Sequence, residues 1–382
     1  MNNRQRFHAT MRYQPRDRAP IIDWGYWDET IERWLAEGLP PEFGADGPLY
    51  NAEHIYRYFG MDFEYRAATW TAGPGGLIPA FEEKVIEDRG NAEVVQQADG
   101  VRVLRHKKMR SIPKHLGHLL EDRHSWEKNY KPRLDPNTPE RYLPDMQARI
   151  PEWRDPQRDW LLVPWVSGLY GPLRDWMGME KISMLVYDDP NWFEEMVSTL
   201  SDCIYGTLEN LLNTGAQLDA CAFWEDMCYN RGPLLHPKHV RQYMLPHYRR
   251  ICDLLHQHGV GTIWLDCDGK IDRLIPIWLE AGINCMMPVE IGTTGQDPLE
   301  MRQKFGRDLL MMGGYDKRIL AGPRDGIRVE IERLSPLVEE GGYIPFCDHL
   351  VPPDVPLENY IFYFECAREI WGKGVNFNPM LT

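Results

Sequence analysis

The chain has 382 residues and a formal net charge of −14, with 57 acidic against 43 basic residues. This balance argues against a nucleic-acid partner, because a nucleic-acid backbone requires clustered lysine and arginine. The eight cysteines form no CxxC pair, which favours reduced thiols in a cytoplasmic protein. No signal-peptide core and no apolar run of membrane length occur, so we expect no membrane association.

The N-terminal part predicts one strand and a long insertion. Residues 20–23 form a short apolar run that ends in Asp23, and we expect a first strand there, followed by a helix over 28–39. Turn residues, including an Asp-Gly pair, separate strand-like runs at 81–87, 92–97 and 101–107, which predicts antiparallel hairpins. We interpret 80–158 as an insertion, in which 109–158 is a surface excursion.

Strands and helices alternate regularly from residue 160 onward. The predicted strands, each followed by a helical stretch, lie at 160–166, 218–224, 262–265, 283–288, 308–312 and 343–346. With the first strand they make seven units, and the chain has room for an eighth. This pattern predicts an α/β fold, a single (β/α)8 TIM-type barrel over residues 1–382 with an N-terminal antiparallel insertion. The rival, a doubly wound sheet, lacks a GxGxxG motif after an early strand.

The stretch 263–269 places two carboxylates at the end of a buried strand. Alternate residues of a strand share a face, so Asp266 and Asp268 are expected to point the same way. Two close like charges require a cation, a hydrogen-bond donor or a shared proton. Asp268 also fits the N-cap of the following helix, and this cap is the alternative interpretation.

The ends of the other strands add acidic, aromatic and basic side chains. In a barrel these positions converge on one mouth, where the chemistry lies. The candidates are Asp23, Trp24, Tyr26, Trp224, Glu225, Asp226, Glu290, Asp316 and His349. Asp316 is alternatively a local ion pair with its basic neighbours at a helix start. Cys267 and Cys347 are either thiolate ligands or small apolar residues.

The C-terminal half resembles the uroporphyrinogen decarboxylase superfamily. The resemblance covers about 160–375 and rests on the segments 280–284 (EAGIN), 309–316 (LLMMGGYD), 341–344 (GGYI) and 348–359 (DHLVPPDVPLEN). It implies a single barrel with its site at the mouth. It also implies one of two chemistries, a cofactor-free decarboxylation of a porphyrinogen or a zinc-assisted methyl transfer to cobalamin. The chain looks closer to the methyltransferase branch, because the decarboxylase signature Arg-Gln-Ala-Gly-Arg-Tyr has no counterpart near 11–16.

The same resemblance implies a set of metal ligands. The methyltransferases bind zinc through His-x-Cys at one strand end and a cysteine in the C-terminal loop. Aligned on Gly269 and on 356–359, these three positions fall on Asp266, Asp268 and His349. All three are ligand types for a divalent metal, with zinc as the expected ion and harder ions as competitors.

Three hypotheses for function follow. The first is a metal-dependent methyltransferase of the demethylase type, which moves a methyl group from a small ether or amine to a corrinoid carried by a partner protein. Glu225 or Asp226 would protonate or orient the leaving group, and Trp24, Tyr26 and Trp224 would form an aromatic wall.

The second hypothesis is a metal-free decarboxylase or lyase acting on a carboxylic acid. His349 and Asp23 would donate protons, and Arg16 or Arg318 would hold a carboxylate. The third is a non-catalytic binding subunit that has kept the barrel. A homodimer is compatible with each of the three, because superfamily members are often dimers.

Overall fold

A six-stranded parallel sheet organises the computed structural model, which describes residues 1–41, 53–62, 65–66, 75–107 and 113–373. The strand order is β14-β13-β12-β11-β8-β7, and all neighbours are parallel. The strands are β7 (Trp165–Ser167), β8 (Cys221–Trp224), β11 (Ile263–Asp266), β12 (Cys285–Val289), β13 (Leu310–Gly313) and β14 (Tyr343–Ile344). Nearly all of their residues are buried, as expected for parallel strands covered by helices.

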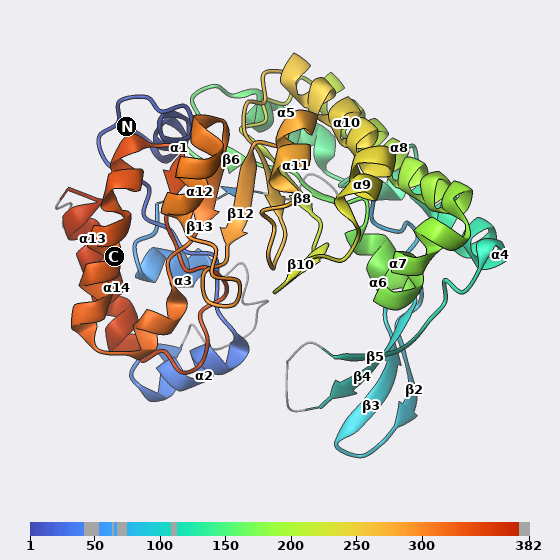
Figure 1. Ribbon diagram of the computed structural model, residues 1–382, viewed down its shortest axis with the longest axis horizontal. Helices are drawn as coiled ribbons and strands as arrows, with labels where there is room; N and C mark the ends of the chain where they lie inside the picture. The colour runs from blue at the N-terminus through green and yellow to red at the C-terminus, as the bar shows by residue number, and fades with distance from the viewer. Residues whose placement is uncertain (42–52, 63–64, 67–74, 108–112, 374–382) are drawn as a thin grey trace.

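Helices connect and cover these strands (Figure 1). They are α6 (Gly171–Met177), α7 (Met179–Asp188), α8 (Pro190–Asn213), α10 (Leu245–Gln257), α11 (Ile275–Ala281), α12 (Pro298–Phe305), α13 (Arg324–Glu340) and α14 (Leu357–Ile370). Two short elements, α9 (Pro237–His239) and η6 (Val240–Met244), precede α10, and η7 (Gly306–Asp308) and η8 (Lys317–Ala321) flank β13. The predicted alternation of strands and helices is confirmed, and no described helix is both long and apolar enough to cross a membrane.

The N-terminal edge of the predicted barrel is less regular than the sequence indicated. Residues 20–23 form no strand, because the backbone N–H of Ile21 donates to Asp62 Oδ2 and the Ile21 carbonyl accepts from the Asp62 N–H. A single parallel bridge joins Tyr26 to Val351. The predicted strand 160–166 is split at Pro164 into β6 (Leu161–Leu162) and β7, and β6 pairs separately with β1 (Tyr65–Arg66). The parallel α/β fold is confirmed, and closure into eight strands stays a prediction.

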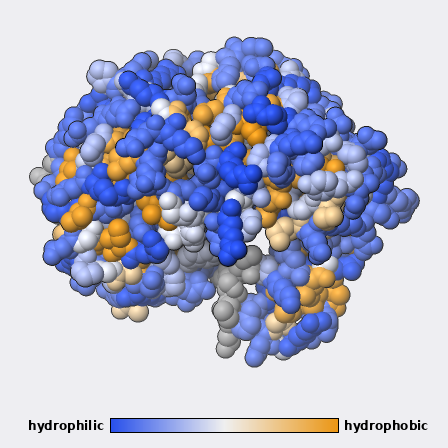
Figure 2. Space-filling model, viewed as in Figure 1, coloured by the Kyte–Doolittle hydropathy of each residue, from blue (hydrophilic) through white to orange (hydrophobic). Residues whose placement is uncertain are grey.

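The antiparallel insertion is present as a four-stranded sheet. Its strands are β2 (Lys84–Asp88), β3 (Ala92–Gln96), β4 (Val101–His106) and β5 (Lys114–His118), in that spatial order. The sheet projects from the body beneath α6 and α7 in Figure 1, and Figure 2 shows apolar side chains on it. Val85, Ile86 and Leu116 are the exposed large apolar residues of these strands.

The second half of the predicted insertion lies mostly at the surface and is anchored to the core by a few buried side chains. It consists of α4 (Arg123–Ser125), η3 (Trp126–Tyr130), η4 (Lys131–Leu134), η5 (Pro139–Arg141) and α5 (Met146–Arg154). Trp126 and Tyr130 are completely buried in the main apolar cluster. Arg141 is buried too, and donates to three backbone carbonyls. Most residues of this segment are exposed, as predicted for a surface segment, but a few aromatic and other side chains anchor it in the core.

Three N-terminal helices complete the fold. They are α1 (Asn3–Met11), α2 (Asp28–Ala36) and α3 (Glu53–Tyr58). A capping box at Asn2 begins α1. Ile31 and Trp34 of α2 are buried, as its apolar spacing predicts. The hairpin of β9 (Cys228–Tyr229) and β10 (Gly232–Pro233) follows β8 and lies beside Gly269.

Candidate metal centre at the carboxyl edge of the sheet

Two adjacent strands bring three aspartates together. Strands β8 and β11 pair in parallel with Asp266 opposite Trp224, so Asp226 and Asp268 each follow two residues beyond this pair. One carboxylate oxygen from each of Asp226, Asp266 and Asp268 lies within 4.8 Å of the others. The backbone N–H of Asp268 also donates to Asp226 Oδ1 at 3.1 Å. The predicted convergence of Asp266 and Asp268 is thus found, with Asp226 as a third member.

Burial and mutual repulsion disfavour three negative charges at this point. Burial, followed by the charge of Asp268, raises the pKa of Asp226 to about 6. Burial, followed by the charges of Asp226 and Asp268, raises the pKa of Asp266 well above its ordinary value. A divalent cation would offset both effects, because it favours the ionised carboxylates. Without a cation, the group must take up protons.

The unpaired oxygens of Asp266 and Asp268 also suit a divalent ion. Within the described part of the chain, the buried Asp268 Oδ1 has no hydrogen-bond partner and the carboxylate of Asp266 accepts no hydrogen bond. Buried polar atoms without partners are rare in folded proteins and mark positions where an ion or water is required. Carboxylate oxygens with one imidazole suit zinc and harder divalent ions.

His349 joins this group from the loop after β14. Its Nε2 lies 3.2 Å from Asp268 Oδ2. Burial alone would lower the pKa of His349, but the hydrogen bond and the charge of Asp268 outweigh burial and raise it. The ring is held between two indoles, edge-on to Trp24 at 5.2 Å and stacked with Trp27 at 6.3 Å between ring centroids. His349 therefore lies beside Asp268, whereas the three side chains whose oxygens lie close enough to one another to share an ion are Asp226, Asp266 and Asp268.

Asp226 occupies a strained backbone position beside a cation. Its φ of 42° lies in the left-handed region, which few residues other than glycine adopt. Its carbonyl accepts from Arg174, and its Oδ2 lies 3.8 Å from an Arg174 nitrogen. Arg174, on α6, also lies over the Trp224 ring at 5.6 Å. Such strain persists where the surroundings impose it and is common at functional sites.

Glu225, the neighbour of Asp226, points the other way and is structural. It is completely buried, and its two oxygens accept from the N–H groups of Leu169 and Tyr170 at 2.7 Å each. Burial raises the pKa of Glu225 to about 7 against these hydrogen bonds. With both oxygens occupied by backbone donors, Glu225 fixes the turn between β7 and α6. This geometry favours Asp226 over Glu225 for the predicted proton transfer.

A second layer of carboxylates holds the loops around the centre. Glu290 Oε2 accepts from the Gly269 N–H at 2.6 Å, and Gly269 must be glycine because a Cβ would lie 2.7 Å from the Tyr229 nitrogen. Asp348 is completely buried and accepts from the Gly292 N–H at 2.7 Å and from Lys317 Nζ at 3.0 Å. These contacts position the backbone on either side of Asp268 and His349.

Two of the strand-end candidates, expected from the sequence to contact the substrate, have local structural roles. Asp316 caps η8 and pairs with Arg318 at 2.7 Å, which matches the alternative interpretation of a local ion pair. Tyr26 is buried among Trp34, Phe59 and Tyr360, with its hydroxyl 2.9 Å from that of Tyr360. Tyr26 therefore packs in the core behind the site, whereas Trp24 and Trp224 lie beside it.

Asp23 forms a buried acid behind the centre. Its Oδ2 accepts from the Tyr360 hydroxyl at 2.7 Å, and its Oδ1 accepts from the Trp24 N–H. Burial raises the pKa of Asp23 to about 6, and hydrogen bonds from Tyr360 and the Cys347 thiol oppose this rise. Burial also raises the pKa of both Cys347 and Cys267 well above the ordinary range. Both are therefore buried thiols in this structure.

Replacing Asp23 with asparagine is expected to change stability in a pH-dependent way. Because the folded-state pKa is raised from 3.8 to about 6, the stability that Asp23 contributes is fully present below about pH 4 and is lost as pH rises through about 6. Asparagine does not titrate, so wild type should lose roughly 3 kcal/mol relative to the variant across this window. Urea unfolding of both proteins at several pH values measures this difference, and a pH-independent difference would contradict it.

Three contributors to the site were not found by sequence reasoning. Trp27 stacks on His349, Arg174 holds Asp226, and Tyr360 holds Asp23. Each contact joins distant parts of the chain. Trp27 and Tyr360 carry only the apolar pattern of core positions, and Arg174 carries only a charge within a short helix. The sequence candidates came from the ends of predicted strands and therefore did not include these three residues.

The whole fold matches a methyltransferase from Methanosarcina mazei. The alignment covers 97% of this chain and 98% of the other, with a TM-score of 0.60 and 14% sequence identity. The shared fold is an α/β architecture of mostly parallel strands with helices.

Sequence comparison identifies the protein family. The family model for uroporphyrinogen decarboxylase (URO-D) matches residues 174–370, which is more than half of the chain. The chain belongs to this family, as the sequence segments predicted.

Curated relatives are distant in sequence. A uroporphyrinogen decarboxylase of Nostoc punctiforme is 23% identical over 252 residues, covering 64% of this chain and 68% of the relative. One from Syntrophotalea carbinolica is 25% identical over 193 residues, covering 50% of this chain and 52% of the relative. The chain therefore spans about half the length of the second relative.

Proposed function

We propose that this protein is a metal-dependent methyltransferase of the demethylase type, built on a closed (β/α)8 barrel. The methyl group passes from a small ether or amine to a corrinoid carried by a partner protein. The observation that carries this proposal is the convergence of Asp226, Asp266 and Asp268 within 4.8 Å, with His349 hydrogen-bonded to Asp268.

Asp266, Asp268 and His349 would hold the ion. They come from the end of β11 and from the loop after β14. When bound, a divalent ion supplies Lewis acidity toward the oxygen or nitrogen that carries the methyl group. Its identity follows from the donors, two carboxylates and an imidazole, which favour zinc or a harder divalent ion over thiolate-seeking metals.

The chain's own residues would handle the proton and the substrate. Loss of a methyl group leaves an alcohol or amine that must take up one proton. Asp226, which has a carboxylate oxygen within 4.8 Å of those of Asp266 and Asp268, is placed to donate that proton when it is itself protonated. Arg174 and the Asp268 N–H fix its orientation. Trp24 and Trp224 provide apolar faces beside it.

Asparagine at position 226 should separate proton transfer from metal binding. We expect Asp226→Asn to keep the metal and to lower kcat by about 10²–10⁴-fold, the usual contribution of a general acid. Formation of methylcobalamin from cob(I)alamin, with a panel of methyl ethers and methylamines as donors, measures kcat, and elemental analysis measures the metal. Asp202→Asn, which changes an exposed aspartate paired with Arg250, is the matched control. Loss of the metal together with activity would instead place Asp226 among the ligands.

A metal-free decarboxylase or lyase is the second candidate. The names of the curated relatives and the buried, protonatable Asp23 favour it. The carboxylate-binding roles of Arg16 and Arg318 find little support. Arg16 donates to the Val338 carbonyl near the C-terminus of α13, and Arg318 is paired with Asp316. Arg174 is a better-placed cation, because it lies beside Asp226. This function would require no metal, which the assay above tests directly.

A further inference from the structure

A cavity opens at the opposite edge of the sheet from the three aspartates. It measures about 350 Å³, a size within the range of small-molecule sites. Its floor includes Leu218 and Asp219, which lead into β8, and its rim includes Gly259, which lies just before β11. It therefore lies at the amino ends of the two strands that carry the aspartates at their carboxyl ends.

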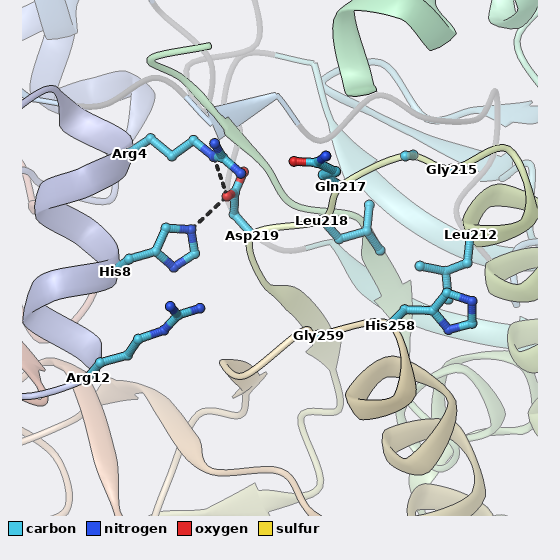
Figure 3. A pocket seen from close by; sticks show the side chains of 11 residues that line it. Arg4, His8, Arg12, Leu212, Gly215, Gln217, Leu218, Asp219, His258 and Gly259 are labelled. Atoms are coloured by element: carbon cyan, nitrogen blue, oxygen red, sulfur yellow. Dashed lines mark hydrogen bonds and ion pairs between the residues drawn. The ribbon is translucent and has the colours of Figure 1, made fainter. Parts of the chain in front are cut away.

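Basic side chains of α1 and of its C-cap residue Arg12 form one wall of this cavity. Figure 3 shows Arg4, His8 and Arg12 projecting from the helix toward the opposite wall, which carries Leu212, Leu218 and His258. Arg4 Nε and His8 Nε2 both bind Asp219 Oδ1, at 2.6 and 2.7 Å. Arg12 is exposed, and its guanidinium makes no hydrogen bond or ion pair with the described residues.

The charges around the cavity do not balance. Asp219 is the acidic residue of its lining, and the buried Arg158 already neutralises it at 2.6 Å. The hydrogen bond from His8 and the charge of Arg158 lower the pKa of Asp219 to about 2 despite its burial, so it remains a carboxylate. Arg4 and Arg158 share the single charge of Asp219 and Arg12 has no acidic partner among the described residues, so the cavity carries an excess of about two positive charges in a chain whose overall charge is −14.

The rest of the lining combines three apolar side chains with Gln217, His258 and two glycines. Leu212, Ala216 and Leu218 are largely buried side chains that face the cavity. Arg4 directs Nε to Asp219 and Nη1 to the Pro156 carbonyl, which leaves Nη2 for a ligand. Two guanidinium groups beside an apolar wall match a dianionic head attached to an apolar body. A phosphate monoester carries close to two negative charges at neutral pH, and arginine binds phosphate through paired N–H groups.

We propose that this cavity binds a small phosphate monoester, with the phosphate on Arg4 and Arg12 and the organic part against Leu212 and Leu218. The site is separate from the candidate metal centre and independent of the reaction proposed for it. A single carboxylate would compensate only one of the two arginine charges. Inorganic phosphate would satisfy both charges and leave the apolar wall uncovered.

The test is calorimetric titration of the full chain with phenyl phosphate, inorganic phosphate and phenol at physiological ionic strength. This salt level screens nonspecific attraction between exposed charges. Phenyl phosphate should bind with one-to-one stoichiometry and more tightly than inorganic phosphate, and phenol should not bind. Arg12→Gln should weaken phenyl phosphate binding about tenfold or more, because it removes charge-assisted hydrogen bonds.

Arg102→Gln provides the matched control, since Arg102 is exposed on β4 in the projecting sheet and loses the same charge. Arg102→Gln should bind as wild type does. An equal loss in the two variants, or unchanged binding in Arg12→Gln, would overturn the site. Equal affinity for phenyl phosphate and inorganic phosphate would overturn the assignment to an organic ester. Absence of binding at millimolar concentrations would overturn the proposal entirely.

Discussion

Asp266→Asn is expected to abolish metal binding and methyl transfer while stabilising the metal-free protein. Asp266 is buried between two other aspartates, and burial and their charges raise its pKa well above the ordinary value. Near neutral pH this carboxyl must therefore either take up a proton on folding or remain charged beside two other carboxylates. Both lower the stability of the metal-free protein. Asparagine has the same shape and no charge, so the metal-free variant should melt a few degrees above wild type.

Thermal melting with and without added zinc measures both effects. Wild type should be stabilised by the ion, because a ligand that binds only the folded state raises its stability. The variant should not respond. Asp202→Asn, at an exposed position, should melt and respond as wild type does. A variant that keeps the zinc response, or is much less stable without zinc, would contradict the role assigned to Asp266.

Gly168→Ala is expected to destabilise the fold severely. A Cβ at this position would lie 1.6 Å from Glu225 Oε2 and 2.5 Å from the Trp224 carbonyl oxygen. The Glu225 carboxylate would have to leave the N–H groups of Leu169 and Tyr170, which would remain buried without acceptors. Overpacking and unsatisfied donors together should cost at least about 3 kcal/mol.

Urea unfolding gives the size of this loss. Gly261→Ala is the matched control, because a Cβ there meets no atom within 4 Å and the backbone is not in the left-handed region. Its stability should stay within about 1 kcal/mol of wild type. If Gly168→Ala unfolds at the same urea concentration as Gly261→Ala, the result would contradict the close contact between Gly168 and Glu225.

Sequence periodicity located the parallel strands because each is a short apolar run between turn residues. It failed at 20–23, where Asp62 takes the backbone hydrogen bonds that a neighbouring strand would need. It also missed the buried anchors Trp126 and Tyr130 in the mostly exposed segment 123–154, where the average polarity hid them. Both errors arise from contacts between distant residues, which local patterns do not contain.

The candidate site was predictable where strand geometry alone decides it. Asp266 and Asp268 share a face because alternate residues of an extended chain do so. The same rule separates Glu225 from Asp226, and the structure places Glu225 toward α6 and Asp226 toward Asp268. The contacts of Arg174 with Asp226 and of Trp27 with His349 join different elements, so only the folded structure reveals them.

The most direct test of the metal centre is elemental analysis of wild type and His349→Ala, both purified without a His-tag or chelator. We predict about one equivalent of a divalent metal in wild type and its loss in the variant, because His349 bonds Asp268 and completes the ligand set. Wild type that remains free of metal even after reconstitution would contradict the metal centre. The aspartates would then be proton-transfer groups, and the decarboxylase or lyase function would take precedence.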